Sequence, residues 1–119
     1  MAFVKIYNGK LVASAGYTLN VGAEEVFNSA STYYISVTTM DSTHVIVCYT
    51  DNGNSDYGTA VCLTLSGTTV TADTANEVVF NSDTTSYISV TTMDSTHAIV
   101  CYTDDGNSDY GTANCIYTT

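Results

Sequence analysis

The side chains capable of acid–base chemistry recur in the sequence at a fixed spacing. His44 follows the run Asp41-Ser42-Thr43, and His97 follows the same run 53 positions later (97 − 44 = 53). A hydrolytic triad needs one asymmetric site in which a base lies between a nucleophile and an orienting acid. Two copies at two short turns do not provide such a site, and neither histidine has a second ligand at metal-binding spacing. We therefore expect both histidines to be turn-edge residues and the protein not to be an enzyme.

An oxygen-rich loop also occurs twice, at residues 51–57 and 104–110. Its carboxylate and amide oxygens are ligands that Ca²⁺ accepts. The same residue types are needed in a tight loop, because Asp, Asn and Ser side chains bond their own backbone. The loop also lacks the Glu that binds Ca²⁺ through both oxygens in an EF-hand. The sequence thus favours a structural loop and no cofactor, with Ca²⁺ as the alternative.

The same two loops supply the candidate residues for binding a ligand or a partner. A shallow glycan site combines aromatic rings, amides and carboxylates, and each loop carries all three. The competing interpretation is that the tyrosines pack between the two halves of the chain. No residue is predicted to be catalytic or to bind a metal. The predicted binding residues are Asp51, Asn54, Asp56, Tyr57, Asp104, Asn107, Asp109 and Tyr110.

The four cysteines occupy equivalent positions, at Cys48 and Cys62 and at Cys101 and Cys115. They lie in predicted strands and form no Cys-x-x-Cys pair, which argues against zinc. If the hairpin folds about Ser55, Cys48 lies opposite Cys62, and a cross-strand disulfide is geometrically allowed. Buried free thiols are the default interpretation, since cysteine in a core strand behaves as a small hydrophobic residue.

An internal repeat underlies these pairs. Residues 26–62 align without gaps with residues 79–115, and 31 of the 37 positions are identical. Self-similarity with a period of this size is typical of solenoids, propellers and tandem arrays. The six differences are Ala30/Asp83, Ser31/Thr84, Tyr33/Ser86, Val45/Ala98, Asn52/Asp105 and Val61/Asn114.

Each repeat predicts antiparallel strands joined by short turns. Within the expected strand 44–50, the run 45–49 is apolar without interruption, which indicates that both faces of this strand are buried. A four-stranded meander that is covered on both faces and repeated in tandem is typical of a β-propeller blade. Strand direction places the loop 51–57 and the connection 81–86 on one face of such an array. The expected strands are 34–40, 44–50, 58–65 and 68–80 in the first copy, and 87–93, 97–103 and 111–117 in the second.

The chain before the first repeat predicts a β-hairpin. Asn8-Gly9 separates the runs 2–7 and 10–13, and Asn-Gly strongly favours a two-residue type I′ turn. A further strand is expected at 17–21. The hairpin aligns with the predicted turn at Ser66-Gly67.

These elements divide the chain into an N-terminal hairpin at 1–25, a first blade at 26–78 and a second blade at 79–119. The second blade lacks its fourth strand and so exposes an unpaired edge, which soluble proteins avoid. We expect the N-terminal hairpin to donate a strand to a neighbouring subunit. The fold class is therefore all-β, with about two blades per chain and a ring completed by oligomerisation. A homotrimer with six blades is favoured.

The loop region resembles the Asp-box of sialidase-like β-propeller blades. Asp51, Gly53, Ser55 and Tyr57 match the motif in type, as do their copies in the second repeat. The departures are an extra residue before the aromatic position, Tyr in place of Trp, and a position after the second strand. Such blades occur in tandem in bacterial and phage-associated proteins. The resemblance covers about 90 residues and implies fold, not activity. The arginine cluster of sialidases has no counterpart here, because the chain contains no Arg.

Composition narrows the classes of partner. Asp and Glu number 12 against 2 Lys and Arg, and the net charge of −10 argues against binding nucleic acid or an anionic membrane surface. The first residues lack an apolar run long enough for a signal peptide, so we expect none, and no run is long enough to insert into a membrane. Residues 4–9 resemble a short segment common in phage tail and fibre proteins.

We expect a structural or interaction protein of a virion or another extracellular assembly, with itself and a virion or cell-surface protein as partners. The alternative is a small lectin with one glycan site per blade. Two-blade lectins that trimerise are known as a family type, but their sugar-binding residues do not map onto this sequence.

Overall fold

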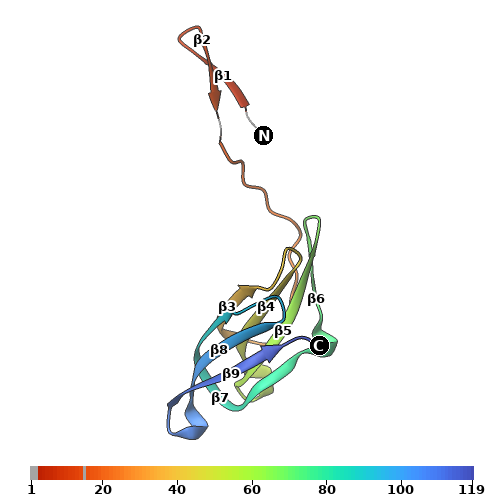
Figure 1. The fold of residues 1–119 in the computed structure, drawn as a ribbon, viewed down its shortest axis with the longest axis vertical. Helices are drawn as coiled ribbons and strands as arrows, with labels where there is room; N and C mark the ends of the chain where they lie inside the picture. Colours follow the sequence, from red (N-terminus) through yellow and green to blue (C-terminus); the bar gives the residue numbers. More distant parts are fainter. Residues whose placement is uncertain (1–2, 15) are drawn as a thin grey trace.

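The structure, a computed structural model, describes residues 3–14 and 16–119. An N-terminal hairpin is formed by β1 (Phe3–Tyr7) and β2 (Lys10–Ser14). It turns at Asn8 and Gly9, whose φ angles of +49° and +75° suit a type I′ turn, so the predicted turn is confirmed. Figure 1 shows the hairpin well apart from the main body, at the end of an extended connection. That connection contains no strand, so the strand predicted at 17–21 is wrong. Ala2, the first residue of the predicted hairpin, lies outside the described residues.

The rest of the chain forms an antiparallel sheet in the order β3-β4-β5-β7-β8-β9, with β6 paired to β5 as a side branch. Strands β3 to β6 belong to the first repeat, β7 begins at the junction and supplies the second repeat's equivalent of β3, and β8 and β9 complete the second repeat. The expected all-β class is confirmed. The bounds are β3 (Thr32–Thr39), β4 (His44–Asp51), β5 (Tyr57–Ser66), β6 (Thr69–Ala72), β7 (Val78–Thr92), β8 (His97–Asp104) and β9 (Tyr110–Tyr117), with single 3-10 turns η1 (Asn52–Asn54), η2 (Thr74–Asn76) and η3 (Asp105–Asn107).

The structure of β7 contradicts two of the predictions. The strand predicted at 68–80 is divided into β6, η2 and the start of β7. The connection predicted at 81–86 is not a loop, because β7 runs through it without interruption. Its first half pairs with β5 and its second half with β8, so tertiary pairing satisfies the backbone groups of a segment whose composition suits a turn. The β5–β6 turn lies at Gly67-Thr68, one residue later than predicted.

The two repeats pack against each other, and the side of the first repeat that is used is not the equivalent of the side that the second repeat uses. One face of the first repeat contributes Met40, Ile46, Cys48 and Ala60, which we call face X. It packs against the opposite face of the second repeat, which contributes Val100 and Tyr102 together with Phe80 and Ile116 and which we call face Y. The Y-face residues of the first repeat form their own cluster of Val47, Tyr49 and Val61, with Phe27 and Leu63 packed against it.

Equivalent strands of the two repeats lie side by side and run in the same direction. The rings of Tyr34 and Tyr87 pack with their centroids 5.1 Å apart. Further along, the amide of Val90 donates to Ser36 Oγ at 3.1 Å, and the hydroxyls of Thr38 and Thr92 are 2.7 Å apart. Each contact joins residues 53 or 54 positions apart. The second repeat is therefore placed beside the first in the same orientation.

Candidate functional site

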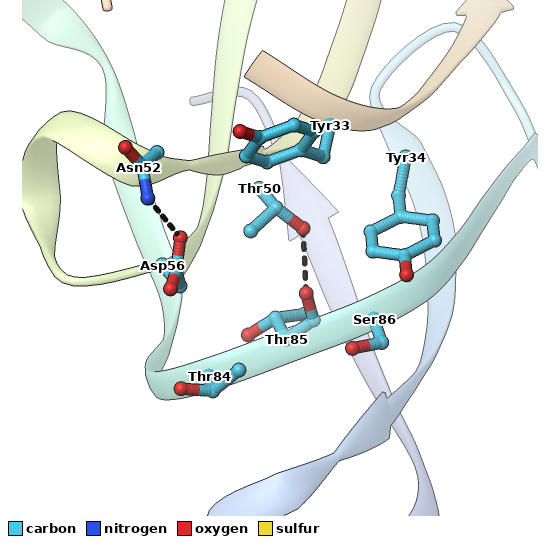
Figure 2. Close-up of a pocket in the computed structure, with 8 residues that line it drawn as sticks. All are labelled: Tyr33, Tyr34, Thr50, Asn52, Asp56, Thr84, Thr85 and Ser86. Carbon is cyan, nitrogen blue, oxygen red and sulfur yellow. Dashed lines mark hydrogen bonds between the residues drawn. The ribbon is translucent and has the colours of Figure 1, made fainter. Parts of the chain in front are cut away.

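The main candidate site is a cleft of about 510 Å³ between the two repeats. Figure 2 shows Tyr33 and Tyr34 along one side and the β7 residues Thr84, Thr85 and Ser86 along the other. A buried bond closes its base, because Thr50 Oγ1 donates to the carbonyl oxygen of Thr85 at 2.6 Å. The cleft is lined by Tyr33, Tyr34, Thr50, Asn52, Asp56, Thr84, Thr85 and Ser86.

The aromatic side chain of Tyr34 reaches this cleft from a strained backbone position. Tyr34 has a φ of +50°, which L-residues rarely adopt. It lies where the β3–β4 register shifts between Tyr33 and Ser36, and such bulges redirect side chains. Tyr87 has a φ of +53° at the equivalent shift in the second repeat. The paired rings remain 45% and 72% exposed, so this strained pair presents aromatic surface beside the cleft.

Of the binding residues predicted from the first loop, only Asp56 lines the cleft. Asp51 is 7% exposed and accepts the Gly53 amide at 3.0 Å and the Asn28 side-chain amide at 3.1 Å. Its predicted role in loop structure is confirmed. Asn54 is exposed on η1, and Tyr57 is half-buried at the start of β5.

The second loop differs from the first. Asp104 accepts the side-chain amide of Asn81 at 3.2 Å, but no backbone amide caps onto it among the described residues. The expectation that Asp104 bonds the backbone of its own loop is therefore wrong. Asn107, Asp109 and Tyr110 are exposed on or beside the β8–β9 loop.

The sequence did not single out seven of the eight cleft residues, namely Tyr33, Tyr34, Thr50, Asn52, Thr84, Thr85 and Ser86. A signal was present, because four of the six differences between the repeats occur at this end of the molecule. Asn52 donates to Asp56 at 2.9 Å, whereas the second repeat has Asp105 there. Desolvation, followed by the neighbouring charge of Asp109, raises the pKa of Asp105. The loop of the first repeat is thus an amide–carboxylate pair and that of the second a carboxylate pair.

The two histidines lie at the opposite turns, as predicted. His44 Nδ1 is 2.9 Å from Asp41 Oδ1 and 3.0 Å from Thr43 Oγ1. Because both contacts use the same ring nitrogen, the groups do not form a relay from a hydroxyl through the ring to a carboxylate. The backbone amide of Thr43, followed by His44, lowers the pKa of Asp41 to about 2. These residues close a turn, and the second repeat repeats the arrangement at Asp94 and His97.

A second candidate site is face X of the second repeat. Its residues are copies of those buried in the first repeat, yet Met93 is 65% exposed against 7% for Met40. Ala113 and Cys101 are likewise exposed, whereas Ala60 and Cys48 are buried. Identical side chains therefore form core in one repeat and surface in the other.

The cysteines of the second repeat are also more exposed than those of the first. All four are free, and Cys48 and Cys62 lie on neighbouring strands, as do Cys101 and Cys115. The predicted register is wrong by two residues, because Cys48 pairs with Ala60 and Ile46 pairs with Cys62. The hairpin is centred on Asn54, one residue before the predicted centre. Burial raises the pKa of the Cys48 thiol to about 12.

Within the described ranges, no group of three or more His, Cys, Asp or Glu residues is arranged to hold a metal ion. None of the helical segments there has the length and apolarity to cross a bilayer. No protein-family model, curated protein sequence or solved structure matches the chain.

Proposed function

We propose that this chain is a non-enzymatic structural protein that assembles with copies of itself. The observation that carries the proposal is the exposed face X of the second repeat. The same residues in the first repeat are almost fully buried, with Cys48 at 0% and Ala60 at 2% exposure. An apolar face of this kind on a soluble protein marks an interaction surface. The near-identity of the two repeats supports a repeat of another copy as the partner of this face.

The packing within one chain supports a directional assembly. Face X of one repeat meets face Y of the next, and the equivalent strands β3 and β7 run in the same direction. Repeating a contact between different faces gives a closed ring or an open filament. We propose a ring of β-propeller blades, in which three chains supply six blades, because propellers have about 4–8 blades. The proposed setting, a virion or another extracellular assembly, is supported by the resemblance of residues 4–9 to phage tail and fibre segments.

A charge placed on the exposed face tests the proposal. Ala113→Glu would bury an unpaired carboxylate in the contact, which we expect to weaken association at least about 100-fold, since such burial costs several kcal/mol. Ser66→Glu, on the exposed end of β5, is the matched control. Light scattering after size-exclusion chromatography measures the mass of each variant. Assembly of Ala113→Glu at wild-type concentrations would show that face X is not the interface.

Glycan binding is the second candidate function, and the cleft between the repeats favours it. Two tyrosine rings, an amide, a carboxylate and several hydroxyls surround about 510 Å³. Aromatic rings stack on the apolar faces of sugars while polar groups orient the hydroxyls. Tyr34→Ala should abolish saturable binding on a glycan array, whereas Tyr117→Ala, an exposed tyrosine outside the cleft, should not. An array without signal for the assembled wild-type protein would exclude this function.

A further inference from the structure

The connection between the N-terminal hairpin and β3 corresponds, residue for residue, to a paired part of the repeat. Applying the same 53-residue offset, residues 16–31 align with residues 69–84, which comprise β6, η2 and the first half of β7. Residues 69–84 complete the sheet of the first repeat by pairing with β5. The equivalent of β5 is β9, and within the described part of the chain no strand pairs with its outer edge.

The side chains of this connection already adopt the arrangement of their copies. The rings of Phe27 and Tyr49 are 5.2 Å apart, and those of Phe80 and Tyr102 are 5.1 Å apart. Asn28 donates to Asp51 at 3.1 Å, just as its copy donates to Asp104 at 3.2 Å. Residues 27–28 therefore contact their own repeat in the same way as their copies in β7 do. The copies in β7 also pair with a strand of the preceding repeat, β5.

Farther toward the N-terminus, the connection carries apolar side chains in solvent. Tyr17, Leu19 and Val21 are 93–100% exposed. Their copies in β6 include Val70 and Ala72, which are half-buried. Large apolar side chains that are fully exposed along one segment indicate a surface that becomes covered.

A glycine in the second repeat indicates where the connection binds. A Cβ at Gly58 would lie 2.5 Å from the Phe80 ring, so this close approach requires glycine. A Cβ at Gly111, the copy of Gly58, would meet no atom within 4 Å among the described residues. The position over Gly111 is thus open among the described residues, whereas Phe80 fills the equivalent position over Gly58, and the copy of Phe80 is Phe27.

We propose that residues 16–31 of one chain add as strands to β9 of a second copy, with Phe27 seated over Gly111. The inference rests on the proposed function and names the segment that joins the subunits. It replaces the expectation that the hairpin 1–25 is the donated element. Adding a strand to an open sheet edge satisfies backbone groups along its whole length. Transferring the β5 pairings gives the intermolecular partners Gly111↔Asn28, Thr112↔Val26, Ala113↔Glu25 and Ile116↔Leu19.

Two glycine variants test the seat of Phe27. Gly111→Val should leave the unfolding temperature of the isolated chain unchanged and lower the assembled fraction at least tenfold. Gly58→Val, the matched control, should destabilise the chain itself, because its side chain would overlap the Phe80 ring. Assembly of Gly111→Val at wild-type concentrations would overturn the proposal.

Cysteine cross-linking tests the strand directly. In a full-length Cys62→Ala, Cys101→Ala, Cys115→Ala background, chains with Val26→Cys are mixed with chains with Thr112→Cys and oxidised. Val37→Cys replaces Val26→Cys in the control, because Val37 and Val26 are similarly exposed, at 58% and 65%. We expect the interchain 26–112 disulfide, identified by peptide mass spectrometry, to exceed the 37–112 product at least tenfold. An oligomer that forms the two disulfides equally would overturn strand donation and would leave the proposal of self-assembly standing. If the background protein and the wild type both stay monomeric, both proposals are refuted.

Discussion

Truncating the same methionine in the two repeats should have opposite consequences for folding and assembly. Met40 is 7% exposed and packs in the core between the repeats, so Met40→Ala should lower the free energy of unfolding by about 2–5 kcal/mol. Met93 is 65% exposed, so Met93→Ala should change the unfolding of the isolated chain by less than about 0.5 kcal/mol. Urea denaturation at a concentration that keeps the chain monomeric measures both.

The effect of Met93→Ala should appear in association. If assembly buries Met93 as deeply as Met40, its exposed fraction falls by 58 percentage points (65 − 7 = 58). Full burial of a methionine contributes about 1.5–3 kcal/mol, so this fraction corresponds to about 1–2 kcal/mol and a roughly 5- to 30-fold weaker Kd. Sedimentation velocity across a dilution series gives the Kd. An unchanged Kd for Met93→Ala would refute the burial of this face between subunits.

Three further predictions concern the first Asp-rich loop, the stability of the chain at low pH and the reactivity of the cysteine thiols. Asp51→Ala should lower the free energy of unfolding by about 1–3 kcal/mol, because it leaves the Gly53 and Asn28 donors without their acceptor, whereas Asn54→Ala, the control in the same loop, should be neutral in the same urea titration. The pKa of Asp41 is lowered from 3.8 to about 2, and that of Asp94 is also lowered, so both carboxylates stabilise the folded chain fully above pH 3.8 and lose this effect as the pH falls toward 2. Thermal melts of the double variant Asp41→Asn/Asp94→Asn should lack this part of the acid dependence of stability. A wild-type-like acid dependence in the double variant would contradict the role of the two carboxylates. Cys101 and Cys115 should react with a thiol reagent in the dilute monomer while Cys48 does not, and assembly should protect Cys101; equal labelling of Cys101 at all concentrations would contradict its burial.

The strands of the repeat could be predicted because their residues specify them locally. The uninterrupted apolar run of β4 indicates a strand that is buried on both faces, and six of its eight residues are buried. Asn8-Gly9 fixes the N-terminal turn for the same local reason. Residues 81–86 mislead, because Asn, Ser and Asp favour a turn, yet pairing with β5 and β8 holds them extended. The positive φ of Tyr34 comes from the β3 bulge, for which the residue type gives no indication.

The candidate sites were harder to predict than the strands. The cleft depends on which segments of the two repeats face each other, and the loop composition indicated only Asp56 among its lining residues. The exposed face of the second repeat has no local signature at all. Met40 and Met93 have nearly identical sequence surroundings, and only the packing of one repeat on the other makes one of them core and the other surface.

If the chain assembles with further copies of itself, the mass of the native particle reveals it. Native mass spectrometry of the full chain, recorded over a concentration series, should show a discrete species at three times the 12.6 kDa chain mass, about 37.8 kDa (3 × 12.6 = 37.8). An open series of multiples would retain the head-to-tail contact and contradict the closed ring. A spectrum that contains only the 12.6 kDa monomer at every concentration would contradict self-assembly of this chain.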